Sequence, residues 1–160
     1  MDHEEVVLRY RRGPDLLAKA LAGISNEEAD FVPVPGKWNI RQIMAHLADS
    51  EYALGMRARQ VMAEGGLTTG PTLIPFDHEA WAEAFDYKSA DPVAALEVFR
   101  VLRLATADLL AKLPAEAFQR IGVHPERGTK TLLEWVGIFA SHPESHAAQI
   151  TSIRKAWRAK

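Results

Sequence analysis

The sequence predicts an all-α protein, a four-helix bundle with elaborated connectors between its helices. Three observations predict this fold: hydrophobic residues recur mainly at helical spacing, strand-like alternation is scarce, and the helix formers Ala and Leu are abundant. The chain has 160 residues, of which 48% are hydrophobic and 25% charged, the usual balance of a globular domain. We therefore expect one domain, 1–160, in which four long helices bury a common core.

The first helix is predicted over residues 3–23. Gly13 and Pro14 interrupt its pattern, so we expect a kink or a new helix start at that point. A connector over 24–38 follows, in which Ser25 can cap a single helical turn before several Pro and Gly residues break the chain.

The second long helix is predicted over 39–64, because Asn39 is a suitable N-cap and two glycines follow the last turn. A loop rich in Gly, Thr and Pro then covers 66–77. Asp77 can cap a short helix over 78–85.

The third long helix begins with Pro92 at its first position and ends before Pro114. The segment 118–131 combines apolar residues with Pro and Gly, a pattern that allows one small β-hairpin. The last helix is predicted over 131–158, where Thr131 opens a capping box.

Composition and charge exclude several classes of function. The formal net charge is −2, whereas a dedicated nucleic-acid binder usually carries a basic excess, so we expect no nucleic-acid partner. The sequence has no Cys, which excludes disulfides, thiolate metal sites and Cys nucleophiles. No apolar run approaches the length of a membrane span, and the N-terminus lacks the pattern of a signal peptide. We expect a cytoplasmic protein with no membrane partner.

Two of the six histidines lie four residues apart on the last predicted helix. His142 and His146 fall within its apolar stripe, where a buried imidazole must find a hydrogen-bond partner or a metal ion. That stripe consists of Leu132, Val136, Phe139, Ile150, Ile153 and Trp157. Catalytic zinc-type sites generally take three protein ligands and leave one position open. His46, at the edge of the second helix's apolar stripe, is the third candidate; the alternative is that all three are core histidines with satisfied hydrogen bonds.

Pro143 lies directly between the two histidines of the last helix. A proline removes one backbone hydrogen bond and disfavours helical geometry at the residue before it, here His142. We therefore expect the helix to kink, which makes the spacing of the pair approximate.

Three polar residues near these histidines have open roles. Asp49 can support the site from behind a ligand or lie in solvent as an ordinary helix carboxylate. Gln149 can hydrogen-bond within the site or face solvent. Glu144 lies two residues from both histidines of the last helix and should point away from them, so it is not a ligand candidate.

Other residues have a functional and a structural interpretation. His124 and Glu126 can reach the site as a base or a substrate contact, or can form a turn with a local hydrogen bond. We expect His78 to cap or flank its short helix and His3 to lie on the surface. The four tryptophans should anchor the core or an interface rather than stack on substrate: Trp38, Trp81, Trp135 and Trp157.

Two motifs in this sequence resemble the signature of the DinB-like superfamily, whose members are helical bundles with a three-His metal site. The first is PGKWNIRQIMAHLADSE over 35–51, with a Trp, then a Gln, then His-Leu in an acidic turn. The second is HPESH over 142–146. The stretches 75–83, 86–87 and 123–126 are similar to the YfiT-like branch, which is described as metal-dependent hydrolases and is related to bacillithiol transferases.

Carried over residue by residue, the resemblance implies that His46, His142 and His146 bind one divalent transition metal per chain. Zn and Ni are the first choices, and Fe and Mn are the alternatives. The sequence departs from the family at Pro143, where we expect a helix-compatible residue, and at Gln149, where the similar branch often has another His.

The resemblance also implies a metal-dependent enzyme that acts on a small molecule. The reaction is either thiol S-transfer, with a low-molecular-weight thiol as cosubstrate, or hydrolysis by an activated water. The segments 66–77 and 123–129 are candidates to wall the pocket. The family commonly forms homodimers, so a homodimer is expected here. The alternative from another class is a non-catalytic, dimeric binding protein whose metal is structural or absent; a closed fourth ligand would favour it.

Overall fold

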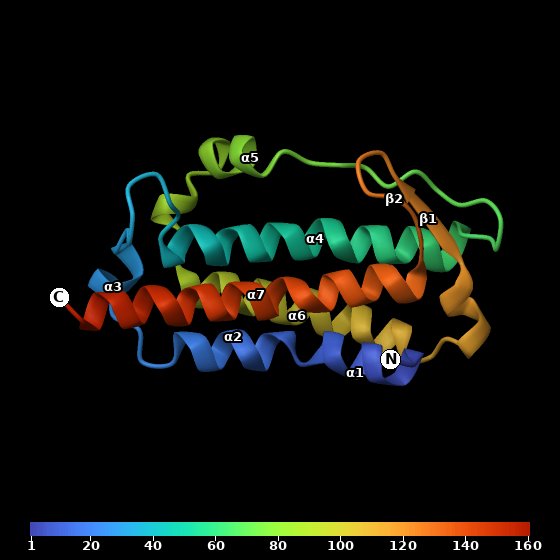
Figure 1. The fold of residues 1–160 in the computed structure, drawn as a ribbon, viewed down its shortest axis with the longest axis horizontal. Helices are drawn as coiled ribbons and strands as arrows, with labels where there is room; N and C mark the ends of the chain where they lie inside the picture. Colours follow the sequence, from blue (N-terminus) through green and yellow to red (C-terminus); the bar gives the residue numbers. More distant parts are fainter.

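Four long helical rods lie side by side in the computed structural model, which describes residues 1–160 (Figure 1). The first rod is made of α1 (His3–Arg11) and α2 (Gly13–Leu21) placed end to end. The other three are α4 (Ile40–Glu64), α6 (Pro92–Leu110) and α7 (Leu132–Arg158). Both α6 and α7 contact the first rod and α4, so the predicted four-helix bundle is confirmed.

The predicted interruption of the first helix lies where this rod meets α7. A side chain at Gly13 would have its Cβ 3.1 Å from Cγ of Pro143 and 3.4 Å from Nη1 of Arg103. Glycine at this position therefore lets the first rod approach α7 closely, and Pro14 then begins α2.

Helix starts predicted from capping residues are confirmed. At α4, the Asn39 side chain accepts a hydrogen bond from the Gln42 amide at 2.9 Å, and the Gln42 side chain accepts one from the Asn39 amide at 3.1 Å. This capping box satisfies amides that a helix otherwise leaves unpaired. N-cap side chains also accept hydrogen bonds from first-turn amides at four other helices: Ser25 at α3 (Asn26–Asp30), Asp77 at α5 (His78–Ala84), Asp91 at α6 and Thr131 at α7.

The helix α7 runs without a break through Pro143. Because proline has no amide hydrogen, the Phe139 carbonyl four residues earlier loses its usual helical donor. Arg103 of α6 donates through Nη1 to this carbonyl at 3.2 Å and to the Tyr10 carbonyl at 3.3 Å. The proline thus leaves an acceptor for an arginine that is completely buried in the bundle.

The predicted β-hairpin is present, formed by β1 (Ile121–His124) and β2 (Gly128–Thr131). The strands are antiparallel, with His124 opposite Gly128, and Gly128 has a φ of 74° that favours glycine. The predicted loop 66–77 runs beside β1, where the Leu73 amide donates to the Val123 carbonyl at 2.7 Å. This contact holds the loop and the hairpin together at one end of α4. Two short 3-10 helices, Tyr87–Ser89 and Ala115–Gln119, complete the connectors.

The buried core consists of two hydrophobic clusters along the bundle. One lies around the fully buried Trp135, whose indole nitrogen donates to the Gly122 carbonyl at 3.2 Å. The other lies around Phe99 and includes Ile43, Leu47 and Ile150. No helix combines the length and the apolar character that crossing a bilayer requires.

Candidate metal centre

Three histidines from two helices meet between α4 and α7. His46 comes from α4, and His142 and His146 come from α7. One nitrogen of each ring can be chosen so that all three lie within 4.8 Å of one another, and Nε2 of His46 is 3.1 Å from Nε2 of His142. A spacing of about 3 Å is what two imidazoles bound to one zinc ion would show, since Zn–N bonds are about 2.0–2.1 Å. The structure thus brings together all three histidines singled out in the sequence.

Neighbouring side chains hold two of the three rings. The Ser50 hydroxyl lies 3.3 Å from Nδ1 of His46, and the Trp38 ring packs against His46 with centroids 5.1 Å apart. Nδ1 of His146 lies 2.9 Å from Oε1 of Gln149, an amide oxygen that can accept a hydrogen bond but cannot donate one. That contact places the proton of His146 on Nδ1 and leaves Nε2 free as a metal ligand. Gln149 therefore hydrogen-bonds within the site rather than only facing solvent.

Burial keeps these imidazoles in their neutral form. Burial, followed by the neighbouring histidines, lowers the pKa of His46 to about 3 and of His142 to about 2. Burial also lowers the pKa of His146, against the hydrogen bond to Gln149. Neutral imidazole is the form that binds a metal, and Nδ1 of His142 is buried without any hydrogen-bond partner. Three such nitrogens suit Zn, Ni, Fe or Cu, and the group contains no carboxylate.

Two acidic residues near the histidines in sequence have other partners. The Asp49 carboxylate accepts a hydrogen bond from the Tyr87 hydroxyl at 2.5 Å, and Tyr87 in turn packs edge-on against Trp38. Asp49 therefore supports the ring that covers His46 and makes no hydrogen bond to a histidine itself. Glu144 points away, as predicted, and pairs with Arg9 of α1 at 2.5 Å.

The structural interpretation of the hairpin turn is confirmed. The Glu126 amide donates to Nδ1 of His124 at 3.2 Å, and the ring of His124 is buried. Both residues also line a cavity of about 250 Å³ that His142 lines too, and their role as a base or a substrate contact stays a prediction. The complete lining is Ser50, Leu54, Arg57, Pro75, Phe76, His78, His124, Glu126, Arg127, Ile138, Phe139, Ser141, His142 and Ser145.

The sequence interpretation of His78 and His3 was incomplete. His78 opens α5, but its ring packs edge-on against His46 with centroids 5.0 Å apart, and burial together with Arg127 and Arg57 lowers its pKa. His3 packs against Phe118 and is half-buried rather than fully on the surface. No sequence pattern within α5 indicates that this helix lies over the histidines, because its position depends on the path of the loop before it.

A buried ion pair next to the histidines was also missed. Glu51, five residues after His46 on the same helix, accepts hydrogen bonds from the Tyr10 hydroxyl and from Nη2 of Arg103, both at 2.5 Å. The side chains of Glu51 and Arg103 have no exposed surface. The sequence places one acidic and one basic residue at core positions of two predicted helices. That placement does not by itself show that the two side chains form an ion pair.

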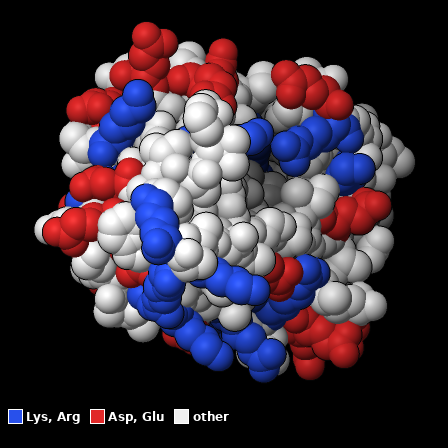
Figure 2. Space-filling view, turned by 60° about the vertical axis from the view of Figure 1, so that its left-hand side comes forward, with Lys and Arg blue, Asp and Glu red and all other residues white.

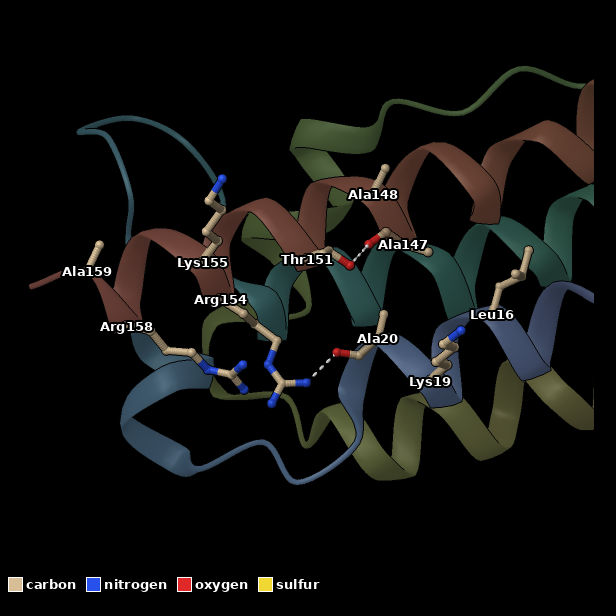
Figure 3. Close-up of a pocket in the computed structure, with 10 residues that line it drawn as sticks. All are labelled: Leu16, Lys19, Ala20, Ala147, Ala148, Thr151, Arg154, Lys155, Arg158 and Ala159. Carbon is tan, nitrogen blue, oxygen red and sulfur yellow. Dashed lines mark hydrogen bonds between the residues drawn. The ribbon is translucent and has the colours of Figure 1, made fainter.

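A second, wider cavity lies between α2 and the C-terminal part of α7 (Figure 3). This α2–α7 groove has a volume of about 580 Å³, a floor rich in Ala, and four basic residues: Lys19, Arg154, Lys155 and Arg158. Figure 2, which brings the C-terminal end of the bundle forward, shows Lys and Arg side chains in a band across the lower part of that face. Glu28 already pairs with Arg154 at 2.8 Å, and no histidine lines the groove.

Residues 9–150 match the family model of the DinB superfamily. This chain belongs to the DinB superfamily. A relative from Oceanobacillus iheyensis, whose name describes it as an inferred metal-dependent hydrolase, is 32% identical over 90% of this chain and 82% of its own length. A relative from Bacillus cereus with the same kind of name is 32% identical over 89% of this chain and 79% of its own length.

Two solved structures share the fold of this DinB-superfamily chain. YfiT from Bacillus subtilis, described as an inferred metal-dependent hydrolase with an unusual four-helix bundle topology, superposes with a TM-score of 0.86 at 28% identity, over 96% of this chain and 86% of its own. A mycothiol-dependent maleylpyruvate isomerase superposes with a TM-score of 0.67 at 18% identity, over 92% of this chain and 60% of its own, and shows the fold alone. The YfiT-like resemblance is confirmed.

Proposed function

We propose that this chain is a metal-dependent enzyme that joins a low-molecular-weight thiol, through its sulfur, to a small electrophilic substrate in place of that substrate's leaving group. The observation that carries the proposal is the convergence of three neutral imidazoles, from His46, His142 and His146, of which His142 also lines a cavity. Three histidines without a fourth protein ligand are typical of metal sites that perform chemistry, whereas structural zinc sites are closed by four.

The residues of the chain have distinct roles in this proposal. The three histidines would hold a divalent ion, Zn or Ni first and Fe or Mn as alternatives, and Gln149 would fix the orientation of His146. A divalent ion in such a site lowers the pKa of a thiol or a water and so supplies a nucleophile at neutral pH. Trp38 covers one side of His46 and limits the access of solvent from that direction.

The donor set favours a thiol as the nucleophile. A thiol has a pKa of about 8.5 and ionises with little help, whereas water has a pKa of about 15.7 and is often assisted by a carboxylate base. Asp49 is committed to Tyr87, and no carboxylate belongs to the histidine group. Hydrolysis is the second candidate, because Glu126 lines the same cavity and the curated relatives are named as hydrolases.

The proposal is tested first by metal content. Tag-free protein should contain about one Zn, Ni, Fe or Mn per chain, and His46→Ala and His146→Ala should each lose it. His3→Ala is the matched control, since His3 packs against Phe118 away from the site. Wild-type protein that stays metal-free after reconstitution would contradict the proposal and favour a non-catalytic binding protein.

The loaded protein is then incubated with thiols and an electrophile such as chlorodinitrobenzene, and loss of free thiol is followed. Metal-dependent thiol consumption above the rate of the His146→Ala variant supports transfer. Metal-dependent hydrolysis of model esters or amides without thiol consumption would replace transfer by hydrolysis as the reaction.

A further inference from the structure

Three arginines are buried in this protein, and only two of them have a carboxylate partner. Arg103 pairs with Glu51 at 2.5 Å, and Arg154 pairs with Glu28 at 2.8 Å. Arg57 is 8% exposed, yet it forms no ion pair with any acidic residue. A buried charge without a partner of opposite sign is costly, so its presence calls for an explanation.

Contacts within the protein fix the orientation of the Arg57 guanidinium. Nε donates to the Ile74 carbonyl at 3.1 Å, and Nη2 donates to the same oxygen. The guanidinium also lies over the Phe76 ring, 5.5 Å from its centroid. These contacts hold the side chain between α4 and the loop, while Nη1 has no acceptor in the protein and remains available to a ligand.

Arg57 lines the same cavity as His142, so one small molecule can contact both. The second basic residue of the lining is Arg127, which also forms no ion pair, and the only acidic residue is Glu126. The cavity therefore carries a positive excess, which attracts an anion. Its volume of about 250 Å³ is small for a ligand site and limits the ligand to a small molecule.

Part of the remaining cavity wall is apolar and suits an organic body, and the rest carries serine and histidine side chains. Phe76 and Pro75 come from the loop before α5, Ile138 and Phe139 come from α7, and Leu54 comes from α4. A planar guanidinium beside an aromatic ring is a common arrangement for holding carboxylates and phosphates.

We propose that this cavity binds a small organic anion, with its oxyanion group paired to Nη1 of Arg57 and its apolar body extending toward His142. The identity of this compound as the substrate rests on the proposed function, but the binding of the anion does not require a metal. Carboxylates and phosphate esters share the oxyanion chemistry, and the experiment separates them.

The test measures the binding of benzoate, phenyl phosphate and neutral benzamide by titration calorimetry, on chelator-treated and on zinc-loaded protein. We expect one of the two anions to bind wild-type protein in both states and benzamide to bind much more weakly. Arg57→Gln should weaken the anion by about tenfold or more, as expected for the loss of a hydrogen bond to a charged group. Lys155→Gln, in the α2–α7 groove, is the matched control and should bind as the wild type does.

Equal binding of benzamide and benzoate, unchanged binding by Arg57→Gln, or no binding of either anion would overturn the proposal. If Arg57→Gln fails to fold, amide shifts of wild-type protein during the benzoate titration decide instead. Shifts centred on the hairpin turn and on 138–142 support the proposal, and shifts confined to the α2–α7 groove overturn it. If the His146→Ala variant loses the metal-dependent reaction but still binds the anion, the anion site stands without the proposed function. If the protein transfers a thiol but binds neither anion, the proposed function stands and the anion site does not.

Discussion

Two polar clusters lie along α4, and they differ in the groups with which their polar atoms pair. In the first, Glu51 receives hydrogen bonds from Tyr10 and Arg103, and Arg103 also donates to two carbonyls, leaving only its Nε without a partner. In the second, the ring nitrogens of the three histidines face one another, and Nδ1 of His142 has no partner.

The difference teaches that burial of polar groups does not by itself identify a functional site. The Glu51–Arg103 pair has its partners in the protein and joins four helices, α1, α4, α6 and α7. The histidines are kept neutral and mutually close, so that they face one another instead of a carboxylate or an arginine. Changes to the first cluster should therefore affect folding, and changes to the second should affect binding.

The largest effect on stability is expected from breaking the ion pair. Arg103→Met leaves Glu51 buried without its cation, so the free energy of unfolding should fall by about 3–5 kcal/mol. Denaturant titration measures this loss. Arg100→Met, at an exposed position of the same helix, is the matched control and should unfold as the wild type does. An unchanged midpoint for Arg103→Met would show that the pair adds nothing to folding.

A smaller loss of stability is expected in metal-free protein when the pH falls. The unfolded chain takes up protons at His46 and His142 near pH 6.5, whereas the folded chain resists them because burial lowers both pKa values, to about 3 and about 2. Stability should thus be complete above pH 6.5 and fall by about 1.5 kcal/mol per histidine between pH 6.5 and pH 5. This window lies above the range in which carboxylates are protonated.

Denaturant titrations at several pH values measure that slope. The double variant His46→Gln/His142→Gln should show a much flatter dependence, since two of the responsible groups are gone. If the free energy of unfolding of the double variant depends on pH as steeply as that of the wild type, other residues cause the pH dependence.

The smallest effect concerns the support of one ligand. Gln149→Ala removes the acceptor at Nδ1 of His146 without changing a proposed ligand, so metal affinity should fall by about tenfold to a hundredfold. Competition with a chromophoric chelator measures the affinity. Thr151→Ala, which alters an exposed hydroxyl on the same helix, should leave it unchanged. Equal affinities in the two variants would show that Gln149 has no role in the site.

Local signals predicted most of the fold. Asn39, Asp77, Pro92 and Thr131 mark helix starts through contacts made within one turn, and such contacts can be inferred from a short window of sequence. The path of the loop before α5 depends instead on its pairing with β1, where a Cβ at Gly70 would lie 1.9 Å from the Ile121 carbonyl. That close approach joins segments about fifty residues apart and has no local sequence pattern.

The same distinction applies to the site. His142 and His146 could be selected because they interrupt an apolar stripe, and His46 because a third ligand was needed; the structure brings the three together, and their binding of a metal stays a prediction. The contributions of His78 and Arg57 could not be inferred, because both depend on where the loop and α5 lie over α4.

The wide separation of His46 from the other two histidines along the chain has a consequence for the unfolding of the protein. His46 and His142 are 96 positions apart, so an ion held by both would act as a reversible cross-link in a chain that has no disulfide. The unfolded chain has no such preformed site, and binding therefore draws the equilibrium toward the folded state by mass action. The melting temperature of this protein should then rise with the logarithm of the free metal concentration and report the metal supply of its surroundings.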